Sequence, residues 1–160
     1  MNQSPLPVCV IGAGPAGLLA GAALKARGIP FEILDAGRQP GGIWDIDRTD
    51  TPMYESAHFI SSKRLSEFPG FPMPASYADY PRHDRILEYI RAFAQHHDLE
   101  PHITFGARVE SAVRREGGGW TVARASGEAR DYRALCVATG TTWYPRVPQV
   151  PGHFDGEVRH

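Results

Sequence analysis

A glycine-rich turn near the N-terminus constrains the fold of this chain more than any other feature. The turn reads Gly12-Ala13-Gly14-Pro15-Ala16-Gly17; it follows the β-branched run 8–11 and opens the helical pattern 15–27. In this GxGxxG spacing the first glycine makes the turn, the second lets a pyrophosphate approach the backbone, and the third lets the helix pack closely on the strand. The N-terminus of the helix offers unpaired N–H groups and a positive dipole end to phosphates. The pattern predicts a dinucleotide-binding β-α-β unit.

An acidic residue at the end of the next strand supports this interpretation. Residues 31–34 form the second predicted strand, which ends at Asp35, 18 residues after Gly17. A carboxylate at this place can accept hydrogen bonds from ribose hydroxyls, and it disfavours a 2′-phosphate. FAD or NAD therefore fits the unit better than NADP, and no arginine cluster that would bind a 2′-phosphate follows in the sequence. The competing interpretation is an ordinary glycine-rich turn followed by a solvated aspartate.

The rest of the chain completes an α/β pattern. Residues 36–83 contain six prolines and seven aromatic residues with little periodicity, which indicates an ordered loop insertion around a ligand. Residues 84–99 have one apolar helical face, and residues 102–105 are predicted to form a strand. Glycine-containing turns divide residues 107–133 into an antiparallel meander, and residues 134–138 return as a buried strand. We expect a Rossmann-type parallel sheet in the order 3-2-1-4, with the meander and the loop insertion added to it.

Composition excludes several classes of function. Hydrophobic residues make up 42% of the 160 residues and charged residues 22%, with a formal net charge of −1, as in an ordinary soluble protein. No basic run indicates a nucleic-acid or membrane partner, no apolar segment is long enough to span a bilayer, and the histidines lack the spacing of a metal site. Cys9 and Cys136 lie in apolar runs and are expected to be buried free thiols. We expect a cytoplasmic protein without a disulfide framework; its oligomeric state is left open.

Four further segments resemble the flavin-containing monooxygenases and their Baeyer–Villiger relatives. Gly41-Gly42-Ile43-Trp44 follows Asp35 and is similar to the Gly-Gly-x-Trp of these enzymes. Residues 60–63 and 68–72 are similar to the family's Asn-Ser-Ser-Lys and Phe-x-Asp-Phe-Pro segments, although Ile60 stands where many members have Asn. Residues 154–160 match the family's FxGxxxH fingerprint. The chain therefore resembles the N-terminal, FAD-binding portion of this family.

The resemblance implies a cofactor, a reaction and a set of binding residues. NADPH would reduce FAD, O₂ would add at the flavin C4a to give a (hydro)peroxide, and one oxygen would pass to a small nitrogen, sulfur or ketone substrate. No side chain is assigned a catalytic role, because the flavin carries the chemistry. The implied FAD contacts are Gly12, Gly14, Pro15, Ala16, Gly17, Asp35, Gly42, Ile43, Trp44, Ser61, Val109, Thr139 and Gly140. Lys63 and the pair His96 and His97 are interpreted as surface or capping residues.

The NADPH-binding half of the family is expected to be absent from this sequence. No second GxGxxG follows the fingerprint His160, so residues 1–160 are interpreted as the N-terminal part of the FAD-binding domain and as inactive when isolated. Two alternatives stay open. One is another two-dinucleotide flavoprotein such as a disulfide reductase, although no CxxC lies near the loop insertion. The other is a non-catalytic FAD-binding module.

Overall fold

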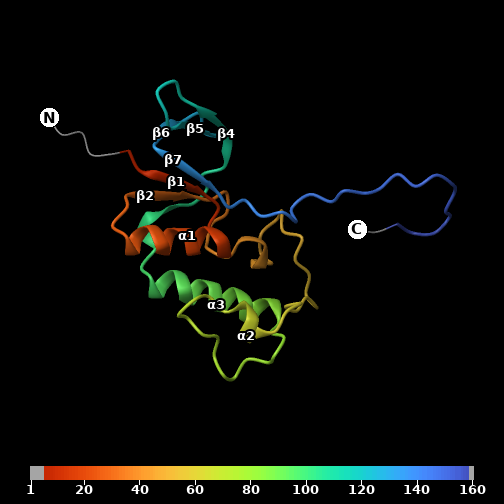
Figure 1. The fold of residues 1–160 in the computed structure, drawn as a ribbon. Coiled ribbons are helices and arrows are strands. Elements are labelled where there is room, and N and C mark those ends of the chain that lie inside the picture. The colour runs from red at the N-terminus through yellow and green to blue at the C-terminus, as the bar shows by residue number, and fades with distance from the viewer. Residues whose placement is uncertain (1–5, 159–160) are drawn as a thin grey trace.

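A four-stranded parallel sheet forms the centre of the molecule. The computed structural model describes residues 6–158. β1 (Val8–Ile11) pairs with β2 (Phe31–Leu34) on one side and with β7 (Ala134–Val137) on the other, and β3 (Ile103–Thr104) extends the sheet beyond β2. The strand order is β3-β2-β1-β7, which confirms the predicted order 3-2-1-4. α1 (Pro15–Ala26) connects β1 to β2 (Figure 1).

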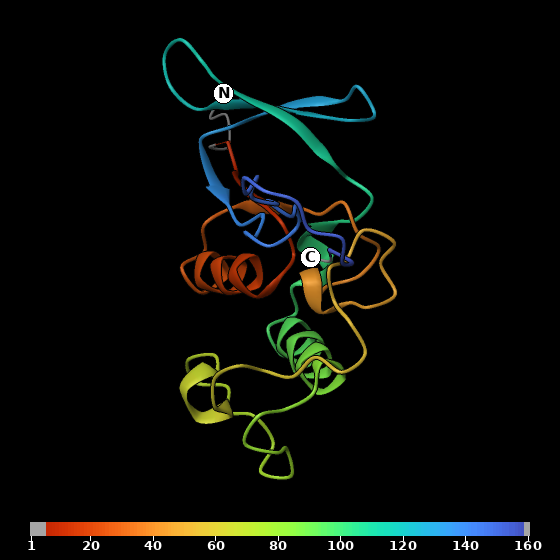
Figure 2. The same ribbon diagram turned by 90° about the vertical axis from the view of Figure 1, so that its right-hand side faces the viewer.

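Alternation along β1 gives the sheet two different faces. Val8 and Val10 belong to a core shared with α1 and α3 (His83–His96), whereas Cys9 packs with Val122 and Tyr132 of the meander. Successive side chains of a strand point to opposite faces, so one short strand supplies both cores. Figures 1 and 2 accordingly show α1 and the meander on opposite sides of the sheet.

The two cysteines differ in their surroundings. Cys9 is fully buried, and burial, with the nearby Glu32 carboxylate adding to it, raises the pKa of its thiol to about 12, so this thiol is protonated and inert. Cys136 is only partly buried, on β7, which has a neighbouring strand on one side in the described sheet. The expectation that both thiols are buried is therefore wrong for Cys136. Both cysteines are free thiols.

Helix α3 begins one residue before the predicted range 84–99 and ends at His96. The chain turns into the left-handed region at Asp98, which has a φ of 47° and stops the helix. The α1 residue Lys25 fixes this end, because its Nζ donates to the carbonyl oxygens of His97 and Asp98. The predicted helix was too long because Leu99, which is buried, continues the apolar pattern after the helix has ended.

The meander and the loop insertion complete the α/β fold. β4 (Val109–Arg114), β5 (Trp120–Arg124) and β6 (Ala129–Tyr132) pair antiparallel in this order. The predicted fold class is thus confirmed. In residues 36–83, the part before α3 begins at His83 contains only the short helices η1 (Gly42–Trp44) and α2 (Lys63–Ser66) and two isolated bridges. η2 (Glu100–His102) precedes β3.

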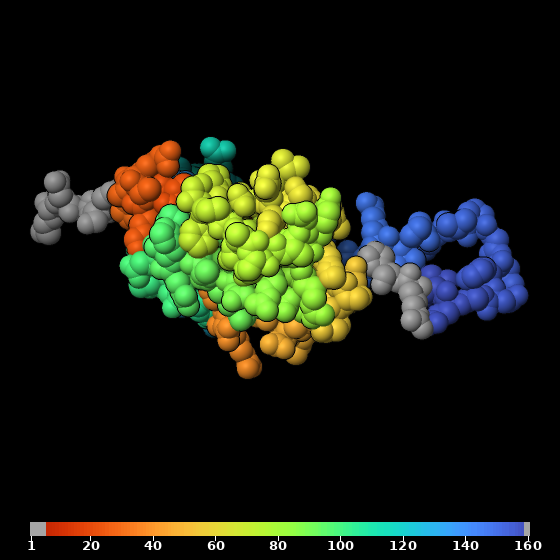
Figure 3. All heavy atoms as spheres, turned by 90° about the horizontal axis from the view of Figure 1, so that it is seen from below, coloured from red at the N-terminus to blue at the C-terminus, as the bar shows by residue number. Residues whose placement is uncertain are grey.

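Aromatic residues of the loop insertion pack on α3 more than on each other. Phe68 and Phe71 both contact the rings of Tyr89 and Phe93. Tyr54 and Tyr80 of the loop are exposed and contribute little to this packing. Figure 3 shows the loop and α3 together covering the lower side of the body, with the C-terminal segment projecting beyond it.

Residues 138–158 contain no helix or strand. The first part of this segment lies against the body, where Trp143 contacts Arg48, and the rest extends away from it (Figure 1). Across residues 6–158, none of the helices combines the length and the apolar character needed to cross a membrane.

Candidate functional site

The three glycines of the turn differ in whether the structure would tolerate a side chain at their positions. Gly12 has a φ of +108°, and a Cβ at this position would overlap the carbonyl oxygen of Ala138. A Cβ at Gly17 would overlap the carbonyl oxygen of Gly12, so this glycine lets the first turn of α1 lie against the end of β1. Gly14 has an ordinary φ of −80°. Its missing side chain is therefore not required by the local backbone.

The Gly-Gly pair packs directly on the glycine turn. The amide of Gly41 donates to the carbonyl of Ala13 over 3.1 Å. A Cβ at Gly42 would lie 3.0 Å from the Cα of Gly14, and Gly42 itself has a φ of +61°. Since neither segment has a side chain at this contact, the two backbones meet closely. This contact places η1, with Ile43 and Trp44, beside the N-terminus of α1, and the Trp44 ring meets the edge of Phe59 at a centroid distance of 5.3 Å.

The N-terminus of α1 is open to an anion. Gly14 is the N-cap, none of the side chains that the structure describes caps the helix, and its first turn holds no acidic residue. Pro15, at the first helical position, has no N–H to satisfy. The amides of Ala16 and Gly17 follow it at the positive end of the helix dipole. This end of the helix can therefore bind a negatively charged group such as a pyrophosphate.

A cleft of about 300 Å³ lies at the carboxyl ends of β1 and β2. Ligands of open α/β sheets bind at this edge. Four of the predicted residues line it: Gly12, Asp35, Val109 and Thr139. Arg48, Asp50, Arg108, Trp143 and Tyr144, which the sequence did not single out, also line it.

Asp35 is buried, and its carboxylate faces the glycine turn. Its side chain accepts hydrogen bonds from the amides of Ala13 and Gly37, each over 2.6 Å. Only 6% of Asp35 is exposed. The competing interpretation of a solvated aspartate is therefore wrong. The carboxylate links the end of β2 to the turn after β1. It therefore lies beside the contact between this turn and Gly42.

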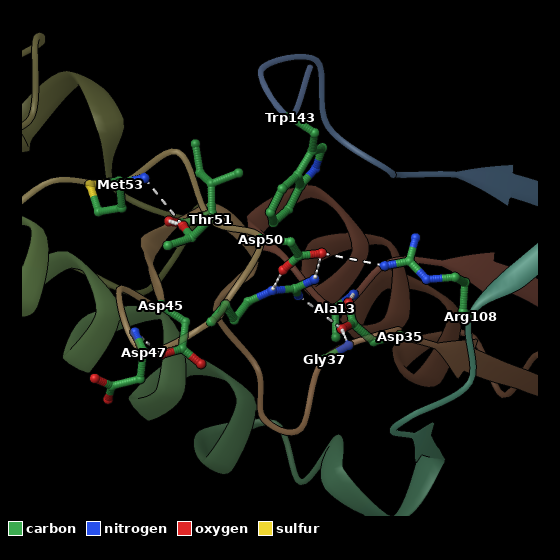
Figure 4. Close-up of polar contacts among 12 residues, drawn as sticks. Ala13, Asp35, Gly37, Asp45, Asp47, Asp50, Thr51, Met53, Arg108 and Trp143 are labelled. Carbon is green, nitrogen blue, oxygen red and sulfur yellow. Dashed lines mark hydrogen bonds and ion pairs between the residues drawn. The ribbon is translucent and has the colours of Figure 1, made fainter. Parts of the chain in front are cut away.

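Two arginines share the cleft with Asp35. The guanidinium of Arg48 lies 3.3 Å from Asp35 Oδ1 and binds both carboxylate oxygens of Asp50, at 3.0 and 3.3 Å. Arg108 Nη2 lies 3.3 Å from Asp50 Oδ2 (Figure 4). The hydrogen bonds from Arg48 lower the pKa of the Asp50 carboxyl. The sequence shows no arginine cluster for a 2′-phosphate, and the two arginines that the fold brings to Asp35 are both paired with Asp50. Arg108 is distant from Asp35 in sequence but close to it in space.

Trp143 covers the other side of the Arg48 guanidinium. The Arg48 Cζ lies 4.7 Å from the centroid of the indole ring, a cation–π distance. The indole N–H donates to the carbonyl oxygen of Thr139. Gly140 lies against the same ring, since a Cβ there would be 3.0 Å from the indole nitrogen. Thr139 and Trp143 thus lie at one wall of the cleft, and Gly140 packs on the Trp143 ring.

Several predicted residues lie outside this cleft. Ile60 is 98% exposed, and the Ser61 hydroxyl is bonded to that of Ser66. Lys63 donates to the carbonyl oxygens of Ala75 and Tyr77, so it braces the loop. His97 packs on Phe93 at the end of α3, which agrees with a structural role. The fingerprint residue His160 lies outside the described residues.

Comparisons with known proteins identify the family. A family model described as flavin-binding monooxygenase-like matches residues 6–160. The chain belongs to this family. It is 38% identical to indole-3-pyruvate monooxygenase YUCCA1 of Oryza sativa subsp. japonica over 94% of its length, but it spans only 36% of that relative.

Solved structures of monooxygenases have the same fold. A flavin-containing monooxygenase from Stenotrophomonas maltophilia is 33% identical with a TM-score of 0.78, covering 92% of this chain and 42% of that one. OTEMO in complex with FAD and NADP is 25% identical with a TM-score of 0.79, covering 94% of this chain and 29% of that one. The chain is therefore partial relative to these relatives.

Proposed function

We propose that this chain is the FAD-binding part of a flavin monooxygenase that uses NADPH and O₂ and oxygenates a small nitrogen, sulfur or ketone substrate. One observation carries the proposal: the side-chain-free contact of Gly14 with Gly42, in front of an uncapped helix N-terminus and next to a buried Asp35. The family supports the reaction class, and the complex of OTEMO with FAD and NADP supports the two cofactors.

The residues present fit FAD. Its pyrophosphate needs backbone donors and close approach, which Gly14, Ala16 and Gly17 supply at the start of α1. Its adenosine needs a ribose acceptor and room, which Asp35 and the cleft bounded by Val109 and Thr139 supply. Gly42, Ile43 and Trp44 lie beside the N-terminus of α1, and we assign them to the flavin half.

Within this scheme the chain's own residues bind and orient. FAD, when bound, supplies the redox chemistry and the activation of O₂. The positive end of α1 offsets the charge of the pyrophosphate, and Asp35 fixes the ribose. Trp44 and Phe59 form an apolar surface beside the Gly-Gly pair, which excludes water from this side. NADPH and substrate would be held by parts of the whole protein, since this chain spans about a third of its curated relatives.

Binding of FAD compared with FMN tests the proposal. FMN lacks the adenosine and the pyrophosphate that the turn, Asp35 and the cleft would hold. We expect FAD to bind the chain at least tenfold more tightly than FMN, as measured by equilibrium dialysis with flavin absorbance. Equal affinity for the two flavins, or no retention of FAD, would overturn the proposed function.

The reaction class needs a separate assay in a polypeptide that contains these residues and completes the family's length. NADPH consumption should depend on FAD and should increase when a thioether, a tertiary amine or a ketone is added. The oxygenated product should carry ¹⁸O from labelled O₂. Label from water in its place would contradict a monooxygenase.

A further inference from the structure

The Asp35 carboxylate has little hydrogen-bonding capacity left for a ribose. An ionised carboxylate can accept about four hydrogen bonds, two at each oxygen. Oδ1 already accepts from the Gly37 amide and from Arg48, and Oδ2 accepts from the Ala13 amide. Counting the partners within the described range 6–158, one acceptor position is therefore free, on Oδ2. A ribose with two hydroxyls needs a second partner.

Arg48 is the group best placed to be that partner. Its side chain is 11% exposed and lines the same cleft as Asp35. Three of the five guanidinium N–H bonds are used, two by Asp50 and one by Asp35, among the contacts within residues 6–158. Two N–H bonds remain, one on each terminal nitrogen. Asp50 and the Trp143 ring hold the guanidinium in place, so these donors have a fixed direction.

We propose that Arg48 is the second ribose-recognising residue of this site. Asp35 Oδ2 accepts a hydrogen bond from one ribose hydroxyl, and a free Arg48 N–H donates to the oxygen of the other. Asp50 is the positioning residue that orients Arg48. This assignment rests on the proposed function, because the ribose is that of the adenosine half of FAD.

The charges of the cleft favour a hydroxyl over a phosphate at this place. Asp35 and Asp50 balance Arg48 and Arg108, so the four side chains together carry no net charge. A 2′-phosphate would need to displace Asp50 from its arginines and to lie beside the buried Asp35 carboxylate. The cluster therefore selects an unphosphorylated ribose although it contains two arginines.

Deoxynucleotides test the assignment. ADP, 2′-deoxy-ADP, 3′-deoxy-ADP and adenosine 2′,5′-bisphosphate are each used to displace FAD from the chain, with flavin fluorescence as the readout. The variants are Arg48→Met, Arg48→Lys and the matched control Arg91→Met. Arg91 anchors the same loop through the Pro40 carbonyl and Asp45, but it does not line the cleft. Thermal melting verifies that each variant is folded.

In the unsubstituted chain each deoxy analogue should bind about tenfold more weakly than ADP, the usual effect of losing a hydrogen bond to a charged group. Arg48→Met should abolish this penalty for the analogue that lacks the hydroxyl bound by Arg48. It should keep the penalty for the analogue that lacks the hydroxyl bound by Asp35. Arg48→Lys should retain part of it, and Arg91→Met should retain all of it. The bisphosphate should bind more weakly than ADP to the unsubstituted chain.

A purely structural Arg48 predicts a different pattern. Arg48→Met would then weaken ADP and both deoxy analogues by the same factor, which would overturn the assignment. Failure of ADP to displace FAD at millimolar concentration would also overturn it, since the adenosine ribose would then contribute little affinity. If neither FAD nor ADP binds the unsubstituted chain, the proposed function itself fails.

Discussion

Gly14 and Gly17 lie three residues apart, but their missing side chains serve different purposes. The space at Gly17 is filled by the Gly12 carbonyl, so the fold itself requires this glycine. At Gly14 a Cβ would make an ordinary contact of 3.5 Å with the Gly42 Cα, and φ is −80°. A methyl group there is compatible with the fold. It would nevertheless stand where a pyrophosphate approaches the backbone.

Alanine substitutions at these two positions should therefore separate stability from binding. Gly14→Ala should melt within a few degrees of the unsubstituted chain and should lose about tenfold or more in FAD affinity. Gly17→Ala should lower the free energy of unfolding by about 3 kcal/mol, as overpacking against backbone does. Urea denaturation and FAD titration measure the two effects. Unchanged FAD affinity in Gly14→Ala would contradict the placement of the pyrophosphate.

At the scale of elements, α3 orders the loop insertion through one tyrosine. The buried Tyr89 hydroxyl accepts from the Phe68 amide and donates to the Phe71 carbonyl, each over 2.6 Å. The two rings of this turn also stack or tilt against Tyr89. Helix α3 thus holds the loop insertion, which comes before it in the sequence. The loop is connected in turn to the glycine turn through Gly41.

Tyr89→Phe should loosen the loop around residues 68–71. Removing the hydroxyl leaves a buried amide and a carbonyl without their partner, which costs about 2 kcal/mol of unfolding free energy. Hydrogen exchange at the Phe68 amide should accelerate at the same time. Tyr77→Phe is the matched control, because the Tyr77 hydroxyl donates to the exposed Glu88 carboxylate. Equal losses in the two variants would show that the Tyr89 hydroxyl does not hold the loop.

Elements that depend on local pattern could be predicted from the sequence, and their ends could not. The glycine turn, the apolar strands and the turn residues of the meander gave the sheet order and the fold class. The end of α3 was missed because Asp98, a non-glycine residue with positive φ, stops the helix. The partial exposure of Cys136 was missed because burial of β7 depends on what lies beyond the strand, which its own apolar residues do not reveal.

At the scale of the whole molecule, the site combines segments that only the tertiary fold brings together. Asp35 and the glycine turn follow from a known spacing, and both were predicted. The Asp50 carboxylate binds Arg108 from 58 positions later in the sequence, and no motif announces that contact. In the sequence, Arg48 and Asp50 are recognisable only as opposite charges near each other in a polar loop. Their place in the cleft follows from how the start of the meander meets the loop.

One carboxylate, that of Glu32, links the two sheets by hydrogen bonds, in addition to the apolar packing of Cys9 with the meander. Glu32 on β2 accepts hydrogen bonds from Thr104 of β3 and from three meander residues, at 2.7 to 3.0 Å: Arg124, Arg130 and Tyr132. Burial raises the pKa of Glu32, but the hydrogen bonds and the two arginine charges outweigh burial, so the net pKa is lowered from 4.5. Glu32 is only 15% exposed on its side chain, so solvent screens these contacts weakly.

The lowered pKa of Glu32 gives a stability contribution with a defined pH dependence. A carboxyl whose pKa is lower in the folded state stabilises the fold above its unfolded pKa, and this contribution is lost as the pH falls through the folded value.

Glu32→Gln should therefore lower the free energy of unfolding by about 2 kcal/mol at pH 7, because two arginines and a buried tyrosine lose a charged acceptor. The difference from the unsubstituted chain should shrink below pH 4.5, the ordinary value for this carboxyl. Urea denaturation of both proteins between pH 7 and pH 3 measures it. Glu88→Gln, which removes an exposed partner of Arg85, is the control and should change the free energy by less than about 0.5 kcal/mol. A difference for Glu32→Gln that stays constant down to pH 3 would mean that its charge does not join the two sheets.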